Sequence, residues 1–256
     1  MKGRTALVTG AGRGVGAAVA SRLASRGATV IVAARTTEQV EGVASALRAL
    51  GHDAHAATCD MTDAKAIARL ATNAQDRFGR VDILVNNAGA ALASSLQKTT
   101  LEDWNRLFTI NATSAFLCLK AFMPAMIERR WGRVVNVASI AGLRGDRYIS
   151  AYAASKHALV GLTTCAAAEA APYGVTINAV CPGYLATEMT RDSVERIMKT
   201  TGRTEEQALD AILQTTPQKR LIQPDEVAAA IEYLCGDAAA GVNGAALVID
   251  GGELRR

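Results

Sequence analysis

The sequence predicts a single doubly wound α/β domain, in which a mostly parallel seven-stranded sheet carries helices on both faces. Short aliphatic runs alternate with longer helical patterns along the chain, and no Pro- or Gly-rich linker divides its 256 residues. Strand–helix alternation requires right-handed crossovers between parallel strands. Half of the residues are hydrophobic, so one large core can be filled.

Seven runs rich in aliphatic residues are the predicted strands. In chain order they are 5–10, 28–34, 53–60, 81–89, 132–139, 174–183 and 246–252. The intervening segments have helical patterns. The segment 62–79, for example, opens on a Thr/Asp cap and closes on glycine.

One segment interrupts the alternation. About forty residues separate Pro182-Gly183 from the helix expected at Pro224-Asp225, and their pattern predicts two short helices joined around Gly202. Long excursions beyond the carboxyl end of a strand often cover a ligand. We therefore expect one domain, 1–256, with a substrate lid at about 186–220. The alternatives are an oligomer contact or a surface insertion.

Composition excludes several classes of protein. The net charge of +4 is spread along the chain, so no nucleic-acid partner is expected. The five cysteines form neither a CxxC motif nor a Cys/His cluster, which predicts free thiols and no metal site. The amino terminus leaves no room for a signal peptide, and no apolar stretch reaches the length of a membrane span. We expect a soluble cytoplasmic protein.

The turn after the first predicted strand, "TGAGRGVG", is rich in glycine. Gly10, Gly14 and Gly16 stand where the backbone turns tightly or approaches a ligand closely. A pyrophosphate can bind there, because the free N–H groups and the dipole of the following helix favour negative charge. Since the turn joins the first strand to the first helix, it predicts a dinucleotide site.

The end of the second predicted strand selects the cofactor. A carboxylate at this point would bind the adenosine ribose and repel an additional phosphate. The chain instead has Ala34 followed by Arg35 and Thr36, and Arg13 in the glycine turn could face the same phosphate. Guanidinium and hydroxyl groups suit a 2′-phosphate, so the sequence predicts NADP(H).

The stretch "SAYAASKHA" places Tyr152 and Lys156 one helical turn apart among small residues. The small residues could simply admit a neighbouring helix. Alternatively, a lysine beside a tyrosine favours the phenolate and tunes it for acid–base chemistry. The pair alone does not decide between these interpretations.

The glycine turn, "NNAG" at 86–89, Asn111, Ser139, Tyr152 and Lys156 follow one another in a single order. This set closely resembles the short-chain dehydrogenase/reductase family over essentially the whole chain. The resemblance implies a Rossmann-type domain that transfers hydride to or from nicotinamide. Tyr152 would be the general acid, and Lys156 would lower its pKa and bind the nicotinamide ribose. Ser139 would polarise the carbonyl, and Asn111 would hold a water-linked proton relay.

The resemblance also implies the other cofactor contacts. Pro182, Gly183 and Thr187 resemble the segment that orients the carboxamide, and Asp60 and Asn87 resemble adenine-side and sheet-stabilising positions. The complete expected NADP(H) set is Gly10, Arg13, Gly14, Val15, Gly16, Arg35, Thr36, Asp60, Met61, Asn87, Ala88, Gly89, Tyr152, Lys156, Pro182, Gly183 and Thr187.

For the substrate, the chain resembles both the polyketide and acyl-carrier ketoreductases and the 3-hydroxybutyrate dehydrogenases. The second branch binds a small carboxylate through polar residues, where this chain has Ala91, Ala141 and Ile149. A carboxylate buried there would lack partners, at a cost of several kcal/mol. A bulky or apolar ketone or a 3-oxoacyl thioester is therefore favoured. The predicted substrate pocket comprises Ala91, Ala141, Leu143, Ile149 and Tyr184.

Some alternatives stay open at this point. Arg144 and Arg147 could meet a phosphopantetheine or coenzyme A phosphate at the pocket entrance. A 3-hydroxybutyrate-type dehydrogenase and a non-catalytic NADP(H)-binding regulatory protein are the competing functions. The family resemblance also implies a homotetramer assembled through the apolar helices expected at 113–130 and 150–171.

Overall fold

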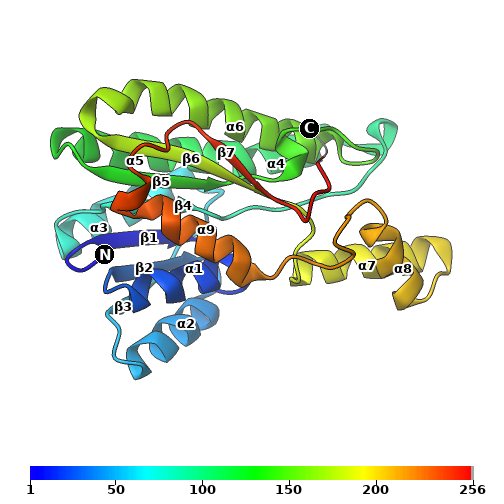
Figure 1. Cartoon of the computed structure of the whole chain (residues 1–256), viewed down its shortest axis with the longest axis horizontal. Coiled ribbons are helices and arrows are strands. Elements are labelled where there is room, and N and C mark those ends of the chain that lie inside the picture. Colours follow the sequence, from blue (N-terminus) through cyan, green and yellow to red (C-terminus); the bar gives the residue numbers. More distant parts are fainter. Residues whose placement is uncertain (255–256) are drawn as a thin grey trace.

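The computed structural model describes residues 1–254 and contains one seven-stranded sheet, in which every strand pair is parallel (Figure 1). The strand order is β3-β2-β1-β4-β5-β6-β7. This confirms the predicted doubly wound sheet. The strands are β1 Thr5–Thr9, β2 Thr29–Ala34, β3 Ala54–Thr58, β4 Ile83–Asn86, β5 Gly132–Val137, β6 Val175–Pro182 and β7 Ala246–Ile249.

Helices fill the crossovers between the strands. They are α1 Gly14–Ser25, α2 Thr37–Ala49, α3 Ala64–Phe78, α4 Leu101–Phe108, α5 Ser114–Glu128, α6 Ser150–Ala170, α7 Glu188–Thr201, α8 Glu205–Leu213 and α9 Pro224–Cys235. The caps predicted for α3 are present. The Asp63 carboxylate accepts the Lys65 N–H at 2.8 Å, and Gly79 ends the helix at φ 71°.

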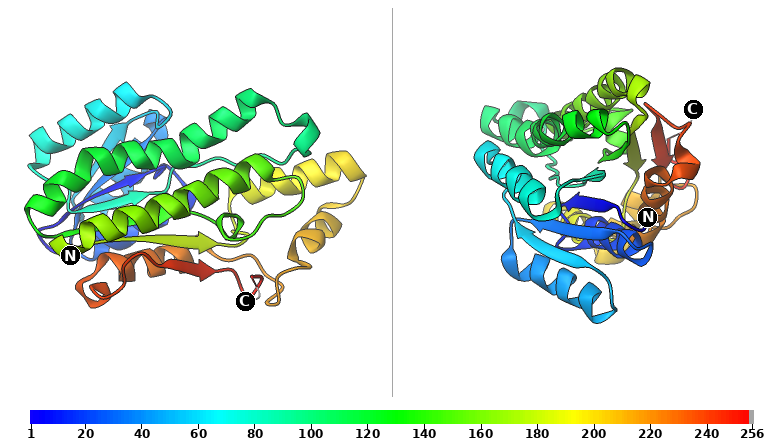
Figure 2. Two further views of the ribbon diagram at one scale, coloured as in Figure 1. Left: turned by 90° about the horizontal axis from the view of Figure 1, so that it is seen from above. Right: turned by 90° about the vertical axis from the view of Figure 1, so that its left-hand side faces the viewer.

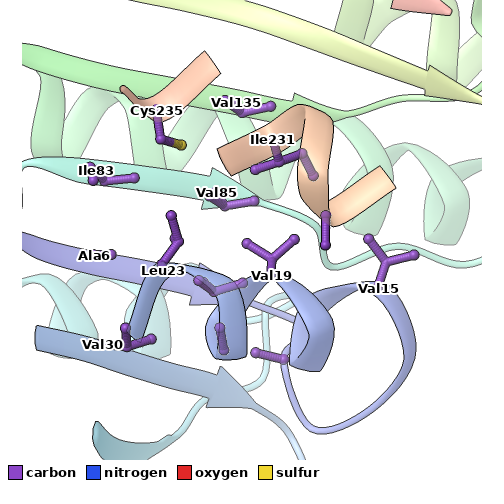
Figure 3. Close-up of a cluster of buried hydrophobic side chains, with 14 of the residues drawn as sticks. Ala6, Val15, Val19, Leu23, Val30, Ile83, Val85, Val135, Ile231 and Cys235 are labelled. Carbon is purple, nitrogen blue, oxygen red and sulfur yellow. The ribbon is translucent and has the colours of Figure 1, made fainter. Parts of the chain in front are cut away.

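Successive strand residues point to opposite faces and build two hydrophobic clusters. On one face, α1, α2 and α9 pack on the sheet, with Val19 and Leu23 of α1 near Ile231 of α9 (Figure 3). On the other face, α3, α5 and α6 cover the alternate strand residues. Figure 1 shows these two helical layers on either side of the sheet. Packing on both faces thus holds the strands in place, and with them the carboxyl ends of the strands.

The strand order reverses between β1 and β4, which are neighbours in the sheet. The crossovers that follow β1 therefore add β2 and β3 on one side of it, and the crossovers that follow β4 add β5, β6 and β7 on the other side. The connections leave a crevice beyond the carboxyl ends of these strands, where doubly wound folds bind ligands.

The excursion after β6 contains α7 and α8, joined through Gly202 at φ 71°. Thr204 and Gln207 form a capping box that begins α8. Both helices lie beyond the carboxyl ends of the strands (Figures 1 and 2). Each packs mainly on the other, through a small cluster of Val194, Ala208 and Ile212. Two short helices thus stand where the sequence predicts a lid.

The expectation that no segment could span a membrane needs a correction. The helical stretch 101–128 is, by length and composition, long and apolar enough to do so. It consists of α4, a π-helical turn at Thr109–Thr113 and α5, which follow one another without a break. The sequence pattern predicts a separate helix at 113–130, which underestimates the length of this stretch. Cys118, Leu119 and Met126 of α5 are nevertheless buried against the sheet, as in the core helix of a globular protein. One such helix is weak evidence for a membrane span.

Candidate active site

A cavity of about 1370 Å³ opens beyond the carboxyl ends of β1 to β6. Most of the residues predicted to bind cofactor or substrate line it, although they come from segments distributed over most of the chain. The lining residues among them are Gly10, Arg13, Gly14, Val15, Arg35, Thr36, Asp60, Met61, Asn87, Ala88, Gly89, Ala91, Ser139, Ala141, Ile149, Tyr152, Lys156, Pro182, Gly183, Tyr184 and Thr187. Gly16, Asn111 and Leu143 lie outside the lining.

The glycine turn is held by Asn87, the residue that directly follows β4. The Asn87 amide donates to the carbonyls of Thr9 and Gly10 at 2.9 and 3.0 Å, and its backbone N–H donates to the Thr9 hydroxyl. Gly10 and Gly14 have φ values of 63° and 55°, which glycine adopts without strain. Asn87 therefore shapes the turn in addition to lining the cavity.

The turn presents an uncapped helix N-terminus to the cavity. Arg13 occupies the N-cap position of α1 without a side-chain cap hydrogen bond, and the first turn contains no acidic residue. Gly14 and Val15 at this end line the cavity. Uncapped N–H groups and the helix dipole suit a phosphate. The site therefore fits the pyrophosphate of a dinucleotide.

We expect Gly16→Ala to weaken dinucleotide binding at least tenfold and to lower the melting temperature. A Cβ atom at Gly16 would lie 2.5 Å from the Gly10 carbonyl and 2.6 Å from the Asn87 amide, so the turn would have to move. Calorimetric titration and thermal unfolding measure the two effects. Gly42→Ala is the control, because a Cβ there meets nothing within 4 Å and lies inside α2. Equal effects of both changes would contradict this account of the turn.

Arg13 differs from its expected role. Its guanidinium forms an ion pair with Glu188, the first residue of α7, and so faces the excursion after β6. The sequence could not reveal this partner, because 175 residues separate the two side chains. A role for Arg13 at a 2′-phosphate is therefore weakened by the Glu188 pair.

Arg35 and Thr36 line the cavity at the end of β2. Across from them, one Asp60 carboxylate oxygen accepts the backbone N–H of Thr62 at 2.9 Å and its hydroxyl at 2.7 Å. These bonds, with a smaller contribution from the Arg35 charge, hold the pKa of Asp60 below its ordinary value. Asp60 is thus a hydrogen-bond acceptor of fixed position, close enough to the Arg35 guanidinium to be affected by its charge.

Ser139, Tyr152 and Lys156 meet at the centre of the cavity. The Ser139 hydroxyl accepts the Ala141 N–H at 3.1 Å and donates to the Pro182 carbonyl at 3.5 Å, which fixes it between β5 and β6. Lys156 is only 5% exposed, and its ammonium donates to the Val137 carbonyl at 2.8 Å. Burial lowers the pKa of Lys156 to about 8.

The Tyr152 phenol departs from the sequence-based expectation that Lys156 lowers its pKa. Desolvation raises the pKa of Tyr152 above its ordinary value, and the hydrogen bond with Ser139 opposes this effect. The Lys156 ammonium lies 5.9 Å from the Tyr152 ring centroid and is directed to Val137 instead. Tyr152 therefore holds its proton at neutral pH, as a general acid must.

Asn111 stands behind the cavity wall, in a π-helical turn between α4 and α5. Its carbonyl oxygen accepts the Ala90 N–H, and its amide donates to the Ala90 carbonyl and to the Ser155 hydroxyl, all at 2.9–3.0 Å. A π turn redirects a single side chain within a helix and is often found at functional sites. Asn111 is thus tied to the active-site helix through Ser155, the neighbour of Lys156, and the water-linked relay stays a prediction.

Sequence reasoning missed a buried polar chain that orients α6. The Asn86 amide donates to Asn136 on β5 at 2.8 Å, and the Asn136 amide donates to the Thr163 hydroxyl of α6 at 2.8 Å. Asn136 and Thr163 are almost fully buried. Buried amides need such partners, so this chain fixes the helix that carries Tyr152 and Lys156. An asparagine inside an aliphatic strand was the available signal.

At the substrate end, Leu143 was assigned wrongly to the pocket. It packs against the third hydrophobic cluster, which includes Leu159 and Cys181, because the short helix at Ile140–Gly142 turns it inward. Arg144, expected at the entrance, is paired with Glu253 at 3.4 Å. Ala91, Ala141 and Ile149 do line the cavity, and their contact with a substrate stays a prediction.

Comparison with known proteins agrees with this geometry. A family model described as short chain dehydrogenase matches residues 4–197. The putative ketoacyl reductase 1 of granaticin polyketide synthase from Streptomyces violaceoruber is 40% identical and covers 96% of this chain and 92% of its own. The D-beta-hydroxybutyrate dehydrogenase of Rhizobium meliloti (strain 1021) is 38% identical, covering 97% and 98%.

Among solved structures, a variant of actinorhodin polyketide ketoreductase with NADPH superposes with a TM-score of 0.95. It is 38% identical, and the match covers 99% of this chain and 98% of the other. Both branches that the sequence resembles are thus represented among these relatives. The family match, the whole-length relatives and the shared fold lead to one conclusion: the chain belongs to the short-chain dehydrogenase/reductase family and is an oxidoreductase that acts on hydroxyl and ketone groups.

Proposed function

We propose that the protein is an NADPH-dependent ketoreductase that acts on a bulky or apolar ketone or a 3-oxoacyl thioester. The observation that carries the proposal is one continuous cavity. It is lined at one end by Arg35 and Thr36, at its centre by Ser139, Tyr152 and Lys156, and at the other end by a wall that includes Ala91, Ala141 and Ile149. Cofactor, acid and substrate wall can therefore act on one bound ketone.

NADPH would supply the hydride, and the chain's residues supply position, charge and a proton. Ser139 hydrogen-bonds the carbonyl oxygen, which polarises it. Tyr152, whose raised pKa keeps it protonated, gives its proton to the same oxygen. Lys156 stabilises the phenolate that remains, and Asn111 holds the Ala90 loop and Ser155 around it. These four residues are the proposed catalytic tetrad.

The substrate class follows from the cavity wall beyond Tyr152. Ala91, Ala141 and Ile149 offer no polar side-chain atom to a substrate carboxylate, and α7 contributes Met189 and Ile197 to the same cavity. We infer that α7 and α8 form a lid over an apolar substrate. Relatives named D-beta-hydroxybutyrate dehydrogenase make a small hydroxy acid the competing substrate.

The test follows NADPH absorbance with a panel of ketones: a soluble 3-oxoacyl thioester, a bulky cyclic ketone, an aryl ketone and acetoacetate. We expect kcat/KM for the thioester or a bulky ketone to exceed that for acetoacetate. Faster turnover of acetoacetate would favour the hydroxy acid dehydrogenase. Cofactor binding without turnover of any ketone or alcohol would favour a regulatory protein.

Arg35 should control the choice of cofactor. We expect Arg35→Ala to lower kcat/KM for NADPH about 10- to 100-fold and to leave NADH nearly unaffected, because only the 2′-phosphate is lost as a partner. Arg13→Ala is the matched control, since Arg13 is already paired with Glu188. Initial rates of wild type and both variants, measured with NADPH and with NADH, test this expectation. A larger loss with Arg13→Ala would mean that the ion pair opens and Arg13 binds the phosphate.

We also propose a homotetramer and a cytoplasmic location. Only 39% of the most apolar window in 101–128 is buried within the chain, and Phe116 of α5 is 48% exposed. An exposed apolar face of this kind is commonly buried in a protein interface, and the same face of a second copy of the chain can bury it. Light scattering should give four times 26.7 kDa, and Phe116→Glu should give smaller species. An unchanged mass in Phe116→Glu would mean that this face does not form the subunit interface.

The proposed cytoplasmic location rests on the cysteines. The five free thiols suit a reducing compartment.

A further inference from the structure

A buried carboxylate, Glu253, forms part of the cavity wall at the substrate end. It is 5% exposed and follows β7 near the carboxyl end of the described chain. One carboxylate oxygen accepts the Thr215 hydroxyl at 3.1 Å and Arg144 Nη2 at 3.4 Å, and the other accepts the Thr216 hydroxyl at 3.3 Å. Residues from two distant segments therefore converge on one buried charge.

The backbone around Glu253 is fixed by a second acid. The Asp250 carboxylate accepts the Gly252 N–H at 2.8 Å and the Leu254 N–H at 2.5 Å. Arg144 Nη1 also donates to the Glu253 carbonyl at 3.4 Å. Because both the chain and the side chain are held, the carboxylate has a defined position in the wall.

The Glu253–Arg144 pair lies close to the reacting groups. Tyr184 lines the same cavity, and the charges of Glu253 and Asp146 add to desolvation in raising the pKa of its phenol, whereas Arg144 lowers it. Tyr184 in turn contributes to the raised pKa of Tyr152. A charge at Glu253 is thus close enough to act on a substrate bound between these two tyrosines.

Other charges line this region, but they are exposed. Arg147 and Asp146 lie on the loop before α6, and Arg191, Asp192 and Arg196 lie on α7. Water and salt screen exposed charges effectively and buried charges much less. The Arg144 side chain is itself 41% exposed, but its pairing with the buried Glu253 carboxylate fixes the guanidinium in the cavity wall. Arg144 is therefore the cation that we consider for recognition of a substrate carboxylate, and Glu253 already neutralises it.

We propose that Glu253 is a specificity-determining residue, which excludes ketones that bear a carboxylate by occupying Arg144. A keto acid would have to displace Glu253 from Arg144 or bring a second negative charge beside it. A neutral ketone or thioester meets no such penalty. The inference rests on the proposed ketoreductase function and adds a residue that sets its substrate class.

The test compares acetoacetate with methyl acetoacetate, which differ only in the charge of the carboxyl group. We expect Glu253→Gln, which keeps the shape of the side chain, to raise the ratio of kcat/KM for acetoacetate to that for the ester at least tenfold. Arg144→Met should lower this ratio below that of the wild type, because Glu253 then faces the substrate unpaired. In the double variant, which combines Glu253→Gln with Arg144→Met, the ratio should not show the increase expected for Glu253→Gln alone.

Glu232→Gln is the control, because Glu232 is also ion-paired and mostly buried but lies on α9 with Arg22 and Arg26. It should leave the ratio unchanged. An unchanged ratio in Glu253→Gln, or a gain that persists in the double variant, would overturn the proposal. If no ketone is reduced, the proposed function fails, and calorimetric binding of acetoacetate to the NADP⁺-saturated protein then tests Glu253 alone. Binding at least tenfold tighter in Glu253→Gln would support it, and equal binding would refute it.

Discussion

Tyr152→Phe is expected to reduce kcat for ketone reduction at least about 1000-fold while NADPH still binds. The change removes one hydroxyl and keeps the ring, so the cavity wall and α6 are preserved. General acid catalysis contributes factors of about 10² to 10⁴, and Tyr152 is the phenol that hydrogen-bonds Ser139. Stopped-flow or steady-state rates give the loss, and fluorescence titration gives the NADPH affinity.

Tyr184→Phe is the matched control, because Tyr184 is the other tyrosine with a raised pKa in the same cavity. It follows β6 and lies outside the Ser139–Tyr152–Lys156 cluster, so we expect a change of less than about tenfold. A large loss with Tyr184→Phe and a small one with Tyr152→Phe would reverse the assignment of the acid. Equal NADPH affinity in both variants would show that neither loss comes from the cofactor.

Local patterns in the sequence are sufficient to predict the sheet, because a parallel sheet buried on both faces requires continuous aliphatic strands. The strands observed at Thr5–Thr9 and Val175–Pro182 lie inside the predicted runs. The spacing of Tyr152 and Lys156 places the two side chains on one helix face, and the tetrad was predicted from the family resemblance of the whole set of motifs. These features depend on residues that are near neighbours along the chain.

The features that the sequence did not predict depend on distant partners. Arg13 meets Glu188, and Arg144 meets Glu253, across 175 and 109 residues. Neither pairing has a local signal, because an exposed arginine and a paired one look alike in sequence. Leu143 shows the same limit, since one short helical turn after Ser139 decides whether it faces the cavity or the core.

The pKa of Tyr152 shows a different limit. Spacing places Lys156 on the same helix face, but it does not tell where the ammonium is directed. The structure directs it to the Val137 carbonyl, so desolvation dominates the pKa of the phenol. Electrostatic effects at the site thus depend on side-chain direction, which residue spacing leaves undetermined.

Lys156→Met should abolish most turnover and, at the same time, stabilise the cofactor-free protein at pH 7. We expect kcat to fall at least about 100-fold, because the charge that stabilises the Tyr152 phenolate is lost. Burial lowers the pKa of Lys156 from 10.5 to about 8, which corresponds to about 3 kcal/mol of destabilisation when the lysine is charged. Loss of the hydrogen bond to Val137 offsets part of the gain, about 1 kcal/mol.

The pH dependence of this stability gain follows from the two pKa values. Below pH 8 both the folded and unfolded chains hold the Lys156 proton, so the folded protein carries the full penalty. Between pH 8 and 10.5 the unfolded chain still holds the proton and the folded chain releases it, so the stability of the wild type rises with pH. The advantage of Lys156→Met should therefore be about 2 kcal/mol at pH 7 and should shrink across this window.

Urea unfolding at several pH values, at one protomer concentration, measures the difference between wild type and variant. Lys65→Met is the control, because Lys65 is exposed on α3 and its change removes one positive charge without removing a buried one. Reduction by the wild type should also slow above pH about 8, as Lys156 loses its charge. A stability gap that does not change with pH, or that widens from pH 8 to 10.5, would mean that Lys156 is not held charged at a cost, and the lysine would then act by geometry alone.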